Sequence, residues 1–305
     1  MLTFLERYRS GEHVQVWNEL VALGEGVRHE LYYADAVAVA AETMRRARHN
    51  VELLLERLAD AQYRFITPSD EYLLEIYSPK PKPSPELVAL SQAAHRGTIW
   101  ASQDPAAMAE RRARRAAVDA ERKAALEAKM AKALNTPPLQ NPDVFDPPGP
   151  QTAALLDKLE EAAGGPMPIS LRAWYEQVGG VSLNGSHPAI NPKESAGPSF
   201  PADPLEVAPL RELVNMIGIE EGENKIGLWI APDDLHKANV SGGEPYTITI
   251  PNASADAVFE YEWHNTTFVK YLRIAFQWGG FPGWEREKNP PREAIAKLSE
   301  GLLPL

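Results

Sequence analysis

Histidine is the residue type of this sequence best suited to acid–base or metal chemistry, but its spacing predicts no metal site. The seven histidines lie at positions 13, 29, 49, 95, 187, 236 and 264, and no two of them are within five residues of each other. Helical zinc sites commonly place two ligands at i and i+4, and neither an HExxH nor an EF-hand pattern occurs. The absence of cysteine excludes disulfides, thiolate nucleophiles and cysteine-bound metals. We therefore expect neither a metal nor a cofactor.

Nucleophilic catalysis has as little support in the sequence. Ser182, Ser186 and His187 are close together, but no GxSxG elbow surrounds them. The glycine-rich stretches lack the lysine and the spacing of a phosphate-binding loop. We assign no catalytic residue. An enzyme that uses Asp or Glu with His236 or His264 as acid and base, in a site between the two halves of the chain, stays as an alternative.

Clustered carboxylates are the candidate binding groups of the C-terminal half. They flank an apolar run of six residues, 226–231, and consist of Glu220, Glu221, Glu223, Asp233 and Asp234. A strand of this length separates the two clusters by roughly 20 Å, a span that suits a protein partner. Residues 151–305 contain 12 Lys and Arg against 21 Asp and Glu, a difference of −9 within a total net charge of −11. This charge opposes binding to nucleic acid or anionic lipid and favours a basic protein surface, although solubility alone also explains it.

The elements around these carboxylates predict an α+β fold with an antiparallel sheet packed by helices. Helices are expected over residues 152–163 and 169–178 from their apolar spacing. Three strands are expected at residues 226–231, 246–250 and 258–263, where β-branched and aromatic residues concentrate between turn-forming residues.

A helix is also expected from residue 268, because Phe268, Leu272 and Phe276 form one apolar stripe at helical spacing. We expect this stripe to pack on the sheet. Phe281 and Trp284 lie outside the stripe, beyond the helix end expected at Gly279, and are therefore candidate exposed partner-binding residues.

The N-terminal residues 1–134 predict an all-helical region. Helices are expected over 14–23 and 33–63, and three further helix starts carry a capping residue followed by proline at Thr67, Ser84 and Asp104. The last of these begins a long Ala/Arg-rich helix expected over 105–135. Three roles are open for it: a solvated helix face, a basic arm for an acidic partner, or an adaptor that pairs with another helix.

Six prolines within residues 135–150 predict a linker there. This linker would separate the helical region from a C-terminal domain at residues 151–305.

The C-terminal half resembles the SUKH superfamily, which includes a fungal cell-wall assembly regulator and many bacterial immunity proteins. The resemblance rests on PMPISLRAWYEQVGGVSLNG at 166–185, on the order of the three expected strands, and on TFVKYL at 267–272. It covers roughly residues 151–285, although the family's Asn-Gly-Gly after the first helix is replaced by Val178-Gly179-Gly180. The resemblance implies a binding domain without a shared reaction, so no catalytic residues are carried over from it.

We therefore interpret the chain as a protein-binding module, with a cognate bacterial toxin as a candidate partner and no catalytic activity of its own. Glu6, Arg7 and Arg9 interrupt the N-terminal segment where a secretion signal would be apolar, and no apolar run reaches the length of a membrane span. We expect a cytoplasmic protein that binds no membrane.

Overall fold

The computed structural model describes residues 2–65, 136–190, 202–216 and 225–305, except 239 and 241, and short helical pieces between 112 and 124. Within this part the fold is α+β, as the sequence predicts. The helices are α1 (Phe4–Arg9), α2 (His13–Ala22), α3 (Tyr33–Asp60), α7 (Thr152–Ala162), α8 (Ile169–Gln177), α9 (Leu210–Met216), α10 (Asp234–Lys237), α11 (Phe268–Gln277) and α12 (Arg292–Ser299). The strands are β1 (Phe145–Asp146), β2 (Gly180–Ser182), β3 (Glu206–Val207), β4 (Ile226–Ala231) and β5 (Tyr246–Ile250). Single 3₁₀ turns are η1 (Gly24–Arg28), η3 (Pro138–Gln140) and η4 (Pro282–Arg286).

Several predicted features fall outside these residues. They include the helix starts at Thr67, Ser84 and Asp104 and most of the long helix expected over 105–135. The three possible roles of that helix therefore stay predictions.

Helix α3 is amphipathic, and its apolar stripe supplies much of the core. Met44, Val51 and Leu55 are seven and four residues apart, lie on one face of the helix and are buried. Arg48 falls on the same spacing, but its guanidinium forms an ion pair with Glu52 at 2.8 Å. This polar residue therefore pairs locally with Glu52, and it also donates to the carbonyl oxygen of Gln177 at 3.1 Å.

The strands pair in an antiparallel manner. Strands β1, β2 and β3 pair in that order, and β4 pairs with β5. The backbone N–H of Ala208, next to β3, donates to the carbonyl oxygen of Ile230 in β4 at 2.7 Å. This hydrogen bond joins the two groups of strands.

Two of the three predicted strands are confirmed with the expected bounds, at 226–231 and 246–250. The third, predicted over 258–263, is reduced to isolated bridges that involve Val258 and Glu260. Tyr261 has a φ of 66°, and this left-handed conformation ends the extended backbone that pairing requires.

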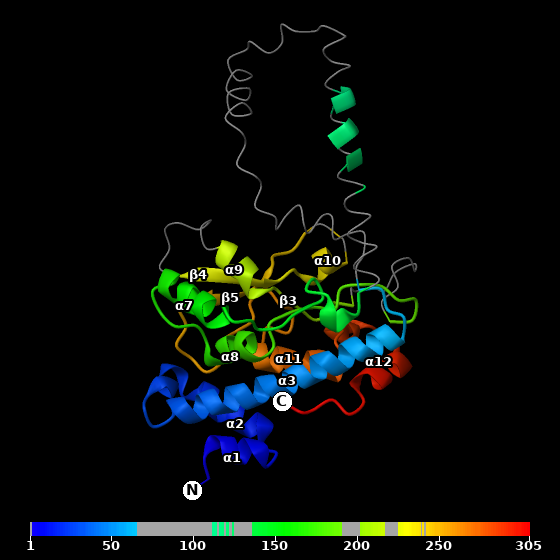
Figure 1. Cartoon of the computed structure of the whole chain (residues 1–305). Coiled ribbons are helices and arrows are strands. Elements are labelled where there is room, and N and C mark those ends of the chain that lie inside the picture. Colours follow the sequence, from blue (N-terminus) through cyan, green and yellow to red (C-terminus); the bar gives the residue numbers. More distant parts are fainter. Residues whose placement is uncertain are drawn as a thin grey trace, which may run out of the picture. The chain divides into compact units, whose positions relative to one another are not determined.

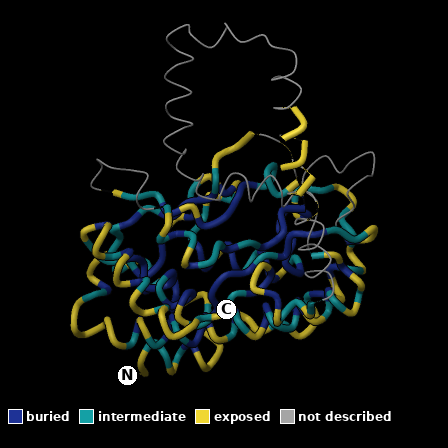
Figure 2. Tube along the Cα trace, turned by 45° about the horizontal axis from the view of Figure 1, so that its top comes forward, coloured by how far each residue is buried: buried dark blue, intermediate teal, exposed yellow. Residues whose placement is uncertain are grey.

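Helices α8 and α11 lie beneath the strands, with α3 below them (Figure 1). The core contains Phe259, whose ring centroid is 5.7 Å from that of Phe268 and 4.8 Å from that of Tyr271. Phe268, Leu272 and Phe276 are all buried, which confirms the predicted packing stripe of α11. In Figure 2 the buried trace runs through the middle of this packed unit, with exposed segments around it.

Phe281 and Trp284 are also buried, with exposed fractions of 0% and 6%. Their assignment as exposed partner-binding residues is therefore corrected. Gly279 and Gly280 have φ values of 61° and 91°, so the chain turns back onto the core directly after α11. The indole Nε1 of Trp284 then donates to the carbonyl oxygen of Ile190 at 3.0 Å.

The N-terminal helices pack together with helices of the C-terminal half. Residues Met1–Thr67 and Thr136–Leu305 form one compact unit, and Pro68–Asn135 are grouped separately. Within the first unit, the guanidinium of Arg28 donates to the carbonyl oxygens of Met167 at 2.6 Å and Ala253 at 3.0 Å. Helix α3 also packs directly on α8.

The domain boundary predicted at residues 135–150 therefore differs from the observed grouping. Strand β1 lies inside this proline-rich segment and pairs with β2. Proline restricts the local backbone, but it is compatible with the end of an edge strand. A proline-rich composition consequently did not mark the end of the packed unit.

Candidate functional site

Four large apolar side chains of the C-terminal half are exposed in β4 and in the segment 258–263, which bridges to β5. Trp229 is 39% exposed, Val258 48%, Tyr261 65% and Trp263 37%. Trp229 belongs to β4, and the other three belong to the segment that bridges to β5. Grouped apolar side chains at the surface mark interaction sites, whereas single ones are common everywhere. We call these four residues the aromatic patch.

The strand register explains why Trp229 and Val258, two members of the patch, face outward. Trp229 lies opposite Thr247 in β5, and Thr247 lies opposite Glu260. Side chains that lie opposite each other across a sheet point to the same face, and alternate residues of one strand point to opposite faces. Trp229, Thr247 and Glu260 therefore form one row on the outer face, and Val258 lies on this face two residues before Glu260.

The Glu260 carboxylate lies over β5 on this outer face. The Thr247 hydroxyl donates to its Oε2 at 3.2 Å, and the Thr249 hydroxyl donates to its Oε1 at 3.0 Å. Thr247 is buried even though it points outward, because its neighbours in the row, Trp229 and Glu260, flank it. The outer face thus combines an exposed indole with a positioned carboxylate.

Trp263 is held at the edge of the patch by two neighbouring side chains. Its ring centroid is 3.6 Å from that of His264. The guanidinium carbon of Arg286, in η4, is 4.9 Å from the Trp263 ring centroid. Arg286 also forms an ion pair with Asp234 of α10. The imidazole of His264 and the guanidinium of Arg286 therefore support this exposed indole, and Asp234 holds Arg286.

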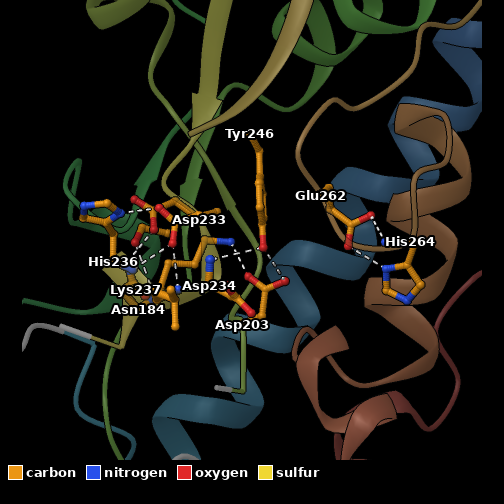
Figure 3. A network of polar contacts seen from close by, with 12 residues as sticks. Asn184, Asp203, Asp233, Asp234, His236, Lys237, Tyr246, Glu262 and His264 are labelled. Atoms are coloured by element: carbon orange, nitrogen blue, oxygen red, sulfur yellow. Dashed lines mark hydrogen bonds and ion pairs between the residues drawn. The ribbon is translucent and has the colours of Figure 1, made fainter. Parts of the chain in front are cut away.

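His264 contacts two carboxylates, those of Glu262 and Glu285, and Figure 3 shows the contact with Glu262. Its Nδ1 is 2.5 Å from Oε1 of Glu262, and its Nε2 is 3.0 Å from Oε2 of Glu285. An imidazolium, which donates from both ring nitrogens, satisfies this geometry. Burial raises the pKa of Glu262, and the hydrogen bond from His264 lowers it in part.

The predicted acidic candidates are placed differently from the aromatic patch. Asp233 is buried and caps α10, accepting from the backbone N–H groups of Leu235 at 2.9 Å and His236 at 3.2 Å. It also contacts the His236 ring, while Asp234 pairs with Arg286. Both carboxylates are therefore bonded within the chain, and the assignment of Asp233 to an exposed recognition surface is corrected.

The other three predicted carboxylates, Glu220, Glu221 and Glu223, lie outside the described residues. Their role stays a prediction.

A buried ion pair joins Lys237, at the end of α10, to Asp203 (Figure 3). Lys237 Nζ is 2.6 Å from Oδ1 of Asp203, and both side chains are fully buried. The Lys237 ammonium also lies 4.8 Å from the ring centroid of Tyr246, whose hydroxyl donates to Asp203 at 3.3 Å. Burial raises the pKa of Asp203, whereas Lys237 lowers it. This network anchors α10 against the start of β5.

Within the described part of the chain, no group of three or more His, Asp or Glu residues is arranged to hold a metal ion. His236 and His264, the two histidines of the enzyme alternative, each have a carboxylate partner. They belong to separate clusters, and their partners Asp233 and Glu262 are buried.

Sequence reasoning missed the aromatic patch, although its signal was present. Strict alternation in IGLWIA places Trp229 on the face opposite to Leu228 and Ile230. The same alternation places Val258 opposite to Phe259. The β-branched and aromatic content of residues 226–231 and 258–263 predicts strands, but this content alone does not separate Trp229 and Val258 from the core residues.

Comparisons with known proteins identify no relative. No protein-family model matches the chain, and neither the curated proteins nor the solved structures contain a significant match. Among the described helices, none combines the length and the apolar character needed to cross a bilayer.

Proposed function

We propose that this protein is a protein-binding module that acts through the aromatic patch, in the manner of a bacterial immunity or regulatory protein. The observation that carries the proposal is the exposure of two tryptophans and a tyrosine in β4 and in the segment that bridges to β5. The resemblance of residues 151–285 to the SUKH superfamily supports a toxin-neutralising role in the cytoplasm. In this proposal the chain needs no cofactor, and catalysis is not its task.

The composition of the patch suits a protein partner. Tryptophan and tyrosine are enriched among the residues that contribute most binding energy in protein interfaces, since they bury a large area at a low cost in conformational entropy. Trp229 is fixed by strand pairing, and Trp263 is supported by His264 and Arg286. Both side chains are therefore positioned before a partner arrives, which reduces the entropic cost of binding.

The proposal is tested by identifying what the full chain binds with and without the patch. The parent protein, the double variant Trp229→Ser plus Tyr261→Ser, and the control Leu31→Ser would each be tagged and used for capture from the native host. Leu31 is 73% exposed but belongs to the N-terminal helical part. We expect one stoichiometric protein that is retained by the parent and the control and lost by the double variant.

The captured protein is then purified and its toxicity is measured with and without co-expression of the parent chain. Neutralisation by the parent but not by the patch variant supports the immunity role. A partner that binds all three proteins equally would contradict the assignment of the patch.

The enzyme alternative is favoured by one arrangement, the contact of His264 with two carboxylates. A histidine with a carboxylate partner can transfer a proton. Capture of a small metabolite with the parent protein, and its loss in His264→Ala, would favour that alternative over a binding module.

A further inference from the structure

The outer face of β4 has an open space beside Trp229. Gly227 precedes Trp229 by two residues and therefore lies on the same face. A Cβ atom added to Gly227 would meet no atom within 4 Å. Gly227 lies opposite Thr249 of β5, so this space is over the start of β4, beside the strand that carries Thr249. We call it the Gly227 notch.

A carboxylate borders this notch. Thr249, the cross-strand partner of Gly227, donates its hydroxyl to Glu260 at 3.0 Å. The Glu260 carboxylate thus leans across β5 toward β4. None of the ion pairs formed among the described residues includes Glu260, whose hydrogen-bond donors here are neutral threonine hydroxyls.

The region has the features of a guanidinium site. It combines the exposed indole of Trp229, the open space at Gly227 and the Glu260 carboxylate, which has no basic partner among the described residues. A guanidinium stacks on an aromatic face and donates two parallel hydrogen bonds to a carboxylate. An ammonium is a compact, strongly hydrated charge and does not stack in this way. The net charge of −11 also favours a basic partner at long range.

We propose that the Gly227 notch receives an arginine side chain of the partner protein, stacked on Trp229 and paired with Glu260. The inference rests on the proposed function and specifies the chemistry of the partner. Thr247 and Thr249 act as positioning residues, since their hydroxyls hold the Glu260 carboxylate over the notch.

The site can be tested on the full chain without knowledge of the partner. The protein would be labelled with 5-fluorotryptophan, and the Trp229 fluorine resonance assigned by its loss in Trp229→Phe. The probe is Nα-acetyl-arginine amide at low ionic strength. Its controls are the neutral isostere Nα-acetyl-citrulline amide and Nα-acetyl-lysine amide. We expect a saturable shift of the Trp229 resonance with the arginine probe, and a shift at least about fivefold smaller with either control.

Two variants separate the parts of the site. Glu260→Gln keeps an oxygen that accepts from both threonines but removes the charge, and we expect about tenfold weaker binding of the arginine probe. Gly227→Val fills the notch with a side chain that suits a strand, and we expect it to abolish the shift. Thermal melting of both variants checks that the fold is kept.

Equal shifts from the arginine and citrulline probes, or unchanged affinity in Glu260→Gln, would overturn the guanidinium site. Loss of the partner in the double patch variant, together with its full retention in Glu260→Gln and Gly227→Val, would overturn this inference while leaving the proposed function in place.

Discussion

The two faces of the β4–β5 pair have the same backbone but opposite chemistry. The inner face contributes Leu228, Ile230 and Ile248, which are buried against the aromatic core. The outer face contributes Trp229 and Glu260, and Val258 extends it. An inward apolar face is required for folding, whereas an outward tryptophan is not. The difference therefore separates residues that stabilise this fold from residues available for recognition.

The same distinction applies to the two aromatic pairs near the end of the sheet. Phe281 and Trp284 are enclosed, and the Trp284 indole is bonded to the backbone. Tyr261 and Trp263 are exposed. Aromatic content alone does not indicate function, because the backbone path decides which rings reach solvent.

The largest effect is expected from removing the N-terminal helices. The sequence alone predicts that residues 151–305 fold independently, but α3 packs on α8 and Arg28 bonds to Met167 and Ala253. A fragment of residues 151–305 would expose the buried surface of α8. We therefore expect a fragment without a cooperative thermal transition, measured by near-ultraviolet circular dichroism. A cooperative melt close to that of the full chain would show that the α3 contacts are dispensable and would restore the predicted boundary.

A smaller but still large effect is expected from truncating the inner core. Phe268→Ala removes a fully buried ring that contacts Trp174 and Phe259. Large-to-small changes of this kind cost about 3–5 kcal/mol of unfolding free energy. The matched change on the outer face, Trp229→Ala, is expected to cost less than about 1 kcal/mol, since surface substitutions have small effects. Denaturant unfolding of both variants measures the contrast, and equal losses would remove the distinction between the two faces.

An intermediate effect on stability is expected at Asp233. Its carboxylate accepts from the first N–H groups of α10 and contacts His236. Loss of such an N-cap costs about 0.5–2 kcal/mol. We expect Asp233→Ala to lower the melting temperature without slowing partner association. A variant with parental stability and slowed association would reinstate Asp233 as a recognition residue.

The smallest effect on stability is a pH dependence from Glu262. Burial raises the pKa of this carboxyl above its unfolded value, so the folded state holds the proton more tightly. Its contribution to stability is thus fully present below the unfolded pKa and is lost as the pH rises through the folded pKa. Glu262→Gln does not titrate. From about pH 4.5 upward, we expect the stability of the parent to decrease relative to this variant.

Melting temperatures between about pH 4 and 8 measure this difference. His264→Ala is the informative companion variant, because it removes the group that lowers the pKa of Glu262. We expect a steeper decrease in stability with pH in that variant. Parallel curves of melting temperature against pH for the parent and Glu262→Gln would refute the raised pKa of Glu262 in the folded state.

Much of the local structure could be predicted from the sequence because it depends on local patterns. The bounds of β4 and β5 and the buried stripe of α11 follow from alternation and helical spacing. The packing of α3 on α8 was not predictable in this way, since it joins residues more than a hundred positions apart. The shortened third strand depends on the left-handed backbone of Tyr261, a conformation that tyrosine rarely adopts.

The candidate site was less predictable than the fold. In the sequence, Asp233 and Asp234 have no apparent partners. In the structure, Asp233 accepts from backbone N–H groups of α10 as its N-cap, and Asp234 pairs with Arg286 of η4. The outward direction of Trp229 could be predicted from the sequence, because alternation along a strand places Trp229 and Leu228 on opposite faces. The Gly227 notch depends on which residues stand opposite each other in the sheet, and the register appears only in three dimensions.

The central claim is that the outer face of the β4–β5 pair binds a protein. Its most direct measurement is the dissociation constant of the purified partner for the parent chain, for Trp229→Ala and for the exposed control Leu31→Ala. Since an interface tryptophan often contributes 2 kcal/mol or more, we expect Trp229→Ala to weaken binding by about thirtyfold. The melting temperature of Trp229→Ala should stay near that of the parent, and Leu31→Ala should bind normally. Parental affinity in Trp229→Ala would contradict the account, because the exposed tryptophan would then have no part in recognition.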